Sequence, residues 1–318
     1  MVSQQKKWSL RGGAELPGAE GRAIVGLMAF DAAFLQTLEA LNLLARRTLA
    51  GDDRAERLTP RKGASLEFAD YRRYTPGDEI RYIDWNVYAR HGNLFVKEFT
   101  AEENVHVSVL LDISRSMDFG GKFRAAKELA AALGYIGLSN YDTLSLFTFG
   151  SEVRPIKKFL RGKGRVFELL SAVDALEPEG QTDMKRAFGP ALPRLRGRSL
   201  VLLITDFYDL SGYSEGIREL LAQRFGIHLI HLVSREEMAP QARGRFSLLD
   251  LETGQSKDAT LLPRTLEAYV RRFRAFCADV EEFGRSHELA YARVISDDPL
   301  EHRVVEILRA GGIVEHRR

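Results

Sequence analysis

The chain of 318 residues has very little cysteine, and this narrows its chemistry. Cys277 is the single cysteine, so no disulfide can form within the chain. A lone thiol fits a reducing compartment, and the helical spacing of the apolar residues around Cys277 favours a thiol packed in the core over a nucleophile. We therefore expect a cytoplasmic protein held together by its hydrophobic core.

Long hydrophobic runs are also missing. No apolar stretch approaches the roughly 20 residues that a membrane-spanning helix needs, because Asp, Arg or Gly interrupts the longest candidates. Lys6 and Lys7 are not followed by the apolar core of a signal peptide. The sequence thus predicts no membrane span.

An excess of one charge sign is a third absence. The chain has 46 basic and 44 acidic residues, a formal net charge of +2, which argues against a dedicated nucleic-acid binder. There is no close His and Cys cluster of the zinc-binding kind. The Gly162-Lys163-Gly164 segment lacks the spacing of a phosphate-binding loop, so the chain shows no ATPase motif of its own.

The first third of the chain differs in character from the rest. Residues 1–30 mix Gly, Ala, Gln and charge without a clear period and are expected to form a flexible leader. Residues 31–104 are expected to hold an N-terminal helix, begun by Asp31, and then a small aromatic-rich β unit with a turn at Thr75-Pro76-Gly77-Asp78. The aromatic and charged side chains of that unit fit either a small core with a salt-bridged rim or a surface for a partner.

From residue 105 onward, continuous apolar strands alternate with amphipathic helices. This alternation predicts a doubly wound α/β fold over residues 105–312, with a mostly parallel sheet covered on both faces. We expect a β-hairpin insertion near residues 244–260 and a short tail over 313–318.

One apolar strand ends in a group of oxygen-bearing side chains. The run from Val105 to Ile113 leads into Asp-x-Ser-x-Ser, at Asp112, Ser114 and Ser116. In open parallel sheets the functional loops gather at the carboxyl ends of the strands. Two more segments reach that edge, a Gly-containing loop with Thr182 and Asp183 and an apolar strand that ends in Asp206. Hard oxygen ligands of this kind favour a divalent ion such as Mg²⁺.

This set of residues resembles the von Willebrand factor A-type domain and its metal-ion-dependent adhesion site. The motif of that family is Asp-x-Ser-x-Ser, a Thr from a second loop and an Asp from a third. The resemblance spans roughly residues 105–312 and implies a site for Mg²⁺, Mn²⁺ or another divalent cation. The implied metal ligands are Asp112, Ser114, Ser116, Thr182 and Asp206. The alternative is that Ser114 and Ser116 merely cap the helix that begins near Lys122.

A second resemblance lies upstream. The segments Phe68–Arg90 and Leu94–Phe99 look like the signature of the bacterial "domain of unknown function 58" family, whose members are associated with MoxR-type AAA+ ATPases. This resemblance implies an A-type domain that acts beside a MoxR-type ATPase in chaperone-like assembly or activation of client proteins. Many members also carry membrane helices near the N-terminus, which this sequence does not predict.

Three functions follow from these observations. The leading hypothesis is a non-enzymatic, metal-dependent protein-binding module whose ion receives a carboxylate from a partner. An alternative is a haloacid-dehalogenase-like phosphatase with Asp112 as nucleophile, but Ser114 stands where that chemistry needs a second acid. The third is a scaffold protein that needs no metal.

Overall fold

The computed structural model describes residues 9–11, 32–50, 66–101, 106–140, 142–191, 199–223, 225–240, 244–249, 256–261 and 263–313. The chain forms two compact units. We call Met1–Asp52 with Val105–Arg318 the sheet unit and Asp53–Asn104 the aromatic unit.

A six-stranded sheet is the centre of the sheet unit, in the order β11-β8-β7-β4-β5-β6. Its strands are β4 (His106–Asp112), β5 (Thr143–Phe149), β6 (Val153–Arg161), β7 (Ser199–Thr205), β8 (Gly226–Val233) and β11 (Ala290–Ile295). All neighbouring pairs are parallel except β5 and β6. This confirms the predicted doubly wound, von Willebrand factor A-like fold.

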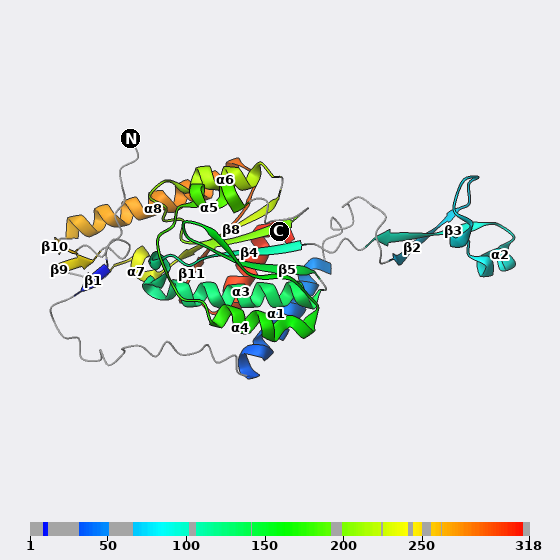
Figure 1. The fold of residues 1–318 in the computed structure, drawn as a ribbon, viewed down its shortest axis with the longest axis horizontal. Helices are drawn as coiled ribbons and strands as arrows, with labels where there is room; N and C mark the ends of the chain where they lie inside the picture. The colour runs from blue at the N-terminus through cyan, green and yellow to red at the C-terminus, as the bar shows by residue number, and fades with distance from the viewer. Residues whose placement is uncertain are drawn as a thin grey trace. The chain divides into compact units, whose positions relative to one another are not determined.

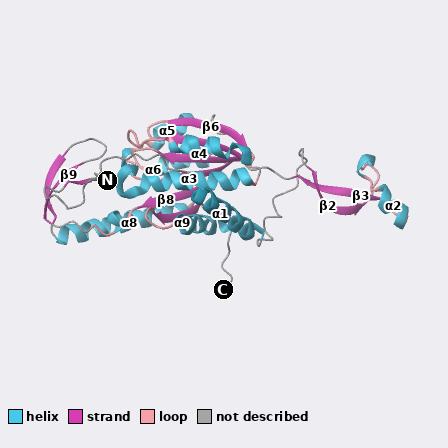
Figure 2. Ribbon diagram, turned by 90° about the horizontal axis from the view of Figure 1, so that it is seen from below, coloured by secondary structure: helices cyan, strands magenta, loops and turns pink. Residues whose placement is uncertain are grey.

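Helices cover both faces of this sheet (Figures 1 and 2). One face packs against α1 (Ala32–Ala50), α3 (Lys122–Ser139), α4 (Val166–Asp174) and α9 (Leu300–Leu308). The other packs against α5 (Met184–Ala191), α6 (Tyr213–Leu221) and α8 (Pro263–Ser286). Among the described helices, none is long and apolar enough to cross a membrane.

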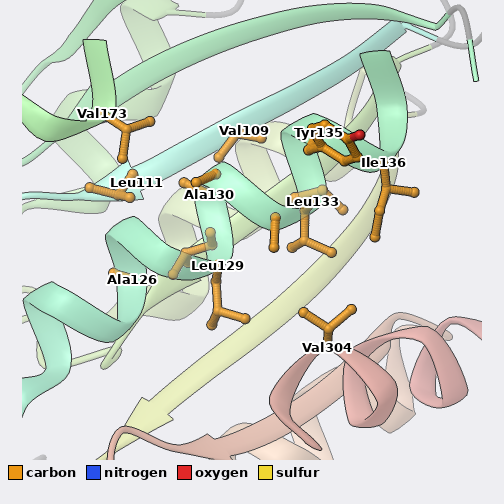
Figure 3. Packing of buried hydrophobic residues seen from close by; sticks show 14 of the residues in the cluster. Val109, Leu111, Ala126, Leu129, Ala130, Leu133, Tyr135, Ile136, Val173 and Val304 are labelled. Carbon is orange, nitrogen blue, oxygen red and sulfur yellow. The ribbon is translucent and has the colours of Figure 1, made fainter. Parts of the chain in front are cut away.

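The alternation of side chains along β4 explains the two layers. Val109 and Leu111 join the core beneath α3, whereas Leu110 joins the core on the opposite face. Figure 3 shows part of the first core, with Leu129 of α3 and Val304 of α9 in the same cluster. Because both faces of β4 are buried, its side chains over residues 109–111 are all apolar, and the acid Asp112 follows them at the strand end.

The helix predicted at the N-terminus belongs to the sheet unit, whereas its place in the sequence predicts a grouping with the aromatic segment. Leu38, Leu41 and Ala45 of α1 are buried in the core that α3 and β4 share. An amphipathic helix is stabilised mainly by covering its apolar stripe, and the large core offers the area to do so. Proximity in the sequence does not indicate where this helix lies, because the helix packs where its apolar stripe can be covered.

A second, small sheet contains β1 (Ser9–Arg11), β9 (Gly244–Leu249) and β10 (Ser256–Leu261). The antiparallel β9 and β10 stand where the hairpin insertion was expected, and β1 pairs with β9. Three residues of the predicted flexible leader thus lie in a strand, and the rest of residues 1–30 lies outside the described residues. The predicted tail after the π-helical turn Arg309–Ile313 also lies outside them.

The aromatic unit holds β2 (Leu66–Arg73) and β3 (Phe95–Ala101), which are antiparallel, the 3₁₀ turn Ile80–Tyr82 and the helix α2 (Trp85–His91). The expectation of short strands joined by turns is incomplete, because α2 lies between them. Asp84 caps this helix by accepting hydrogen bonds from the backbone N–H groups of the second and third residues after it.

Features of both alternatives for the aromatic unit are present. Ile83 and Val96 are buried, and the Arg72–Asp78 ion pair lies at the rim with 2.8 Å between Nη1 and Oδ2. Trp85, by contrast, is 57% exposed and leaves an aromatic surface uncovered.

Candidate metal site

The predicted site lies at the carboxyl edge of the parallel strands. Asp112 is the last residue of β4, and the neighbouring strand β7 ends beside it at Thr205, one residue before Asp206. The loop between α4 and α5 brings Thr182 to the same place. All five predicted ligands are buried, with Thr182 the most exposed of them at 5%.

Asp112 is the centre of one half of the site. Its Oδ1 accepts a hydrogen bond from Ser114 N at 2.9 Å, and Thr182 Oγ1 lies 3.1 Å from both of its carboxylate oxygens. Thr205 Oγ1 donates to Asp112 Oδ2 at 2.6 Å. The carboxylate is thus fixed by donors from its own loop and from two other segments.

The two serines form the other half with Asp206. Ser114 Oγ and Ser116 Oγ are 3.0 Å apart, and Ser116 Oγ donates to Asp206 Oδ2 at 2.8 Å. Neither serine caps α3 with its side chain, because Gly121 occupies the N-cap position of that helix. The capping alternative is therefore wrong for this structure.

Lys122, which the motif does not include, adds a cation to the site. Its Nζ lies 2.7 Å from Asp206 Oδ2 and 2.6 Å from Glu237 Oε1, and Lys122 is 0% exposed. Glu237 belongs to the short helix α7 (Arg235–Met238), where it forms a capping box with Ser234. One sequence signal for Lys122 exists: it opens α3, and a cation at a helix N-terminus is unfavourable unless acids neutralise it.

Thr205 and Glu237 were missed as well. Thr205 immediately precedes Asp206, and because adjacent side chains of a strand point to opposite sides, the sequence offers no signal that both residues contact the site. The capping box Ser234-Arg-Glu-Glu237 is readable in the sequence, but its contact with Lys122 spans 115 residues of chain and depends on the fold.

The charges of the site do not balance. Three buried carboxylates, on Asp112, Asp206 and Glu237, face one buried ammonium, so ionised side chains leave a formal charge of −2. Burial raises the pKa of Asp112 to about 6, and the charge of Asp206 adds to this rise. Burial alone would lower the pKa of Lys122, but Asp206 and Glu237 outweigh it and the pKa is raised.

The donor set fits a hard divalent cation. All five predicted ligands offer oxygen, and adjacent ligands of an octahedral Mg²⁺ at about 2.1 Å stand about 3 Å apart. The Ser114–Ser116 and Thr182–Asp112 oxygen separations of 3.0 and 3.1 Å match that spacing. Within the described ranges no group of three or more His, Cys, Asp or Glu side chains could hold a metal ion, so the hydroxyls are needed to complete this set.

Asp183, the other acid of the Thr182 loop, turns away from the site. Its Oδ1 accepts from Arg186 N at 2.9 Å and from Ser211 Oγ at 3.3 Å.

The phosphatase alternative gains nothing from the geometry, because the position two residues after Asp112 holds the Ser114 hydroxyl, which is too weak an acid for that chemistry.

The chain is similar to a described protein family and to several curated proteins. The family described as "Protein of unknown function DUF58" matches residues 70–277. Among curated proteins, "Uncharacterized protein Rv1480" of Mycobacterium tuberculosis is 24% identical over 257 residues, which cover 78% of this chain and 80% of that protein. "Uncharacterized protein Mb1516" of Mycobacterium bovis matches with the same identity and coverage.

Several solved structures are also similar. The conserved hypothetical protein BatB from Bacteroides thetaiotaomicron is 13% identical, with a TM-score of 0.40, and the match covers 65% of this chain and 98% of that one. A von Willebrand factor type A protein from Catenulispora acidiphila is 18% identical, with a TM-score of 0.39, over 67% of this chain and 44% of that one. Since the family match covers more than half of the sequence, the chain belongs to the DUF58 family.

Proposed function

We propose that the chain is a non-enzymatic protein-binding module that depends on a divalent cation. Asp112, Ser114, Ser116 and Thr182 would hold the ion together with Asp206, and an Asp or Glu from a partner would complete its ligand set. The observation that carries this proposal is the formal charge of −2 among wholly or almost wholly buried groups. Buried charge is costly unless it is paired, and a divalent cation would compensate it.

A hollow beside the site offers room for a partner's side chain. Its volume is about 190 Å³. Its wall includes Ile113, which stands between Asp112 and Ser114, and Gln181, which precedes Thr182. Ser and Thr hydroxyls are weak ligands, so an ion held by them keeps positions that water or an external carboxylate can fill.

The partner in this proposal is a MoxR-type AAA+ ATPase, and the shared task is chaperone-like assembly or activation of a client protein in the cytoplasm. Membership of the DUF58 family supports this pairing, through the association described for that family. The acid that reaches the ion would come from the ATPase or from the client.

Thermal unfolding with Mg²⁺ and Mn²⁺ tests the metal site. Both ions should raise the melting temperature of the wild type, because an ion at a hundred times its Kd stabilises the folded state by about 2.7 kcal/mol. Asp112→Asn keeps the shape of the side chain and should abolish the shift. Asp183→Asn is the matched control, since that acid lies in the same loop system but faces Ser211, and it should keep the shift. An Asp112→Asn shift equal to that of the wild type would contradict the proposal.

A binding assay with a purified MoxR-type ATPase from the same source tests the partner. Wild type and Asp183→Asn should bind the ATPase, or an ATPase–client mixture, with Mg²⁺ and lose it with EDTA. Asp112→Asn should bind weakly under both conditions. Equal recovery by all three proteins in EDTA would favour the metal-independent scaffold.

A further inference from the structure

The Lys122 ammonium occupies a place where a cation is normally too costly. Its side chain is 0% exposed, and Nζ lies 5.3 Å from the centre of the Tyr208 ring. An ammonium in such surroundings requires close anionic partners, and Lys122 has two, Asp206 and Glu237. The chain therefore maintains a buried ammonium beside the predicted ligands, although methionine of similar length would be easier to bury.

The two site acids are held differently. Asp112 accepts hydrogen bonds from hydroxyl groups and one backbone amide, all neutral donors. Asp206 Oδ2 accepts from the charged Lys122 and from Ser116, and Asp206 Oδ1 accepts from Tyr208 N at 3.0 Å. The ammonium at 2.7 Å adds a Coulomb attraction that the neutral donors of Asp112 lack, so Asp206 is the more firmly retained acid.

We propose that Lys122 is a positioning residue that draws Asp206 away from direct coordination of the ion and so keeps one coordination position for an external carboxylate. Asp112 and the hydroxyls of Ser114, Ser116 and Thr182 would then form the direct contacts. This inference rests on the metal site of the proposed function and adds to it the device that keeps the ion open to a partner's acid.

Glu237 keeps the ammonium in place. Its Oε1 contacts Lys122, while its Oε2 accepts from Ser234 N at 2.9 Å and from Ser234 Oγ at 3.1 Å. Ser234 directly follows β8, so the position of Asp206 at the end of β7 is tied to the next strand of the sheet. Lys122 and Glu237 together are a neutral pair, and their joint removal leaves the formal charge of the site unchanged.

That neutrality makes a charge-matched test possible. Lys122→Met/Glu237→Gln retains the charge of −2 carried by Asp112 and Asp206 but frees Asp206 from the ammonium. If position matters, this variant should bind Mn²⁺ roughly tenfold more tightly than the wild type, within the range by which outer partners of metal ligands change affinity. Its bound Mn²⁺ should also relax water protons less, because Asp206 replaces a water molecule.

The experiment is titration calorimetry with Mn²⁺ and water-proton relaxation of the Mn²⁺-loaded protein, after circular dichroism has verified the fold. Asp183→Asn should match the wild type in both measurements. Should the methionine variant fail to fold, Lys122→Gln/Glu237→Gln, which retains a neutral donor, is measured in its place with the same expected directions.

The outcomes separate the two proposals. Wild type without measurable Mn²⁺ binding at millimolar concentration would refute the metal site itself. Wild type that binds, with a charge-matched variant of equal or weaker affinity and equal relaxation, would leave the metal site standing and overturn the positioning role of Lys122.

Discussion

Lys122 Nζ and Asp206 Oδ2 lie 2.7 Å apart, and both side chains are wholly buried. This pair joins the first residue of α3 to the residue that follows β7, across 84 positions of the chain. Breaking a buried ion pair on one side leaves an uncompensated charge, which is usually more damaging than removing both partners. The pair therefore makes the stability of the metal-free chain depend on residues that also belong to the proposed metal site.

The first prediction concerns Lys122→Met. Three buried acids would then face no ammonium, and we expect the free energy of unfolding to fall by about 3–5 kcal/mol in EDTA. Mg²⁺ should recover much of this loss, because the ion replaces the missing positive charge. Urea unfolding with and without Mg²⁺ measures both effects.

The matched control is Lys127→Met in the same helix. Lys127 is also buried, but its Nζ donates to the backbone carbonyls of Asp174 and Leu176, at 2.6 and 3.2 Å, away from the site. This variant should lose stability that Mg²⁺ recovers no better than in the wild type. Equal recovery in both lysine variants would mean that the ion acts elsewhere.

The second prediction concerns Thr205→Val, which removes the 2.6 Å hydrogen bond to Asp112 Oδ2 with almost no change in volume. A carboxylate that loses a supporting donor is less well oriented, and we expect Mg²⁺ affinity to fall by roughly 10- to 100-fold. Thr148→Val serves as the control, since Thr148 is equally buried in β5 but is not among the site residues. Calorimetric titration measures the Mg²⁺ affinity. The same affinity in Thr205→Val and the wild type would show that Thr205 does not support ion binding.

The sequence predicts a structural feature well where that feature depends on a single helix or strand. Apolar side chains fill residues 109–111 of the buried strand β4, so the acid Asp112 is conspicuous, and α3 begins at Lys122, where the sequence predicts the start of a helix. Contacts between residues far apart in the chain could not be predicted from the sequence. The Lys122–Glu237 contact and the packing of α1 on the sheet unit depend on side chains that the fold brings together. Helix α2 was not predicted, because Trp85, Tyr88 and their charged neighbours form no clear apolar stripe.

The third prediction concerns Gly216 in α6, where α5 packs most closely. A Cβ at this position would lie 2.5 Å from Met184 Cβ and 2.6 Å from the Met184 carbonyl carbon, and backbone atoms cannot give way cheaply. Gly216→Ala should therefore lower the free energy of unfolding by about 1–3 kcal/mol despite the better helix propensity of alanine.

Gly137→Ala in α3 isolates the steric effect, because the nearest atom to its new Cβ is 3.9 Å away, an ordinary contact. This variant should gain about 0.5–1 kcal/mol. Chemical denaturation measures both proteins, and a Gly216→Ala variant as stable as Gly137→Ala would show that α5 and α6 are packed less closely than described.

The last prediction joins the backbone at the start of α3 to the metal site. Gly120 and Gly121 both have a positive φ, +59° and +68°, which costs any other residue energy. A Cβ at Gly120 would also lie 2.3 Å from Ser234 Cβ, whereas a Cβ at Gly121 would meet nothing nearer than 4.0 Å. Gly120→Ala must therefore displace Ser234 and, with it, the Glu237 carboxylate that holds Lys122. Both variants should lose stability, but only Gly120→Ala should alter the affinity for Mn²⁺. Equal Mn²⁺ affinities in the two variants would mean that the Ser234–Glu237 contact does not influence ion binding.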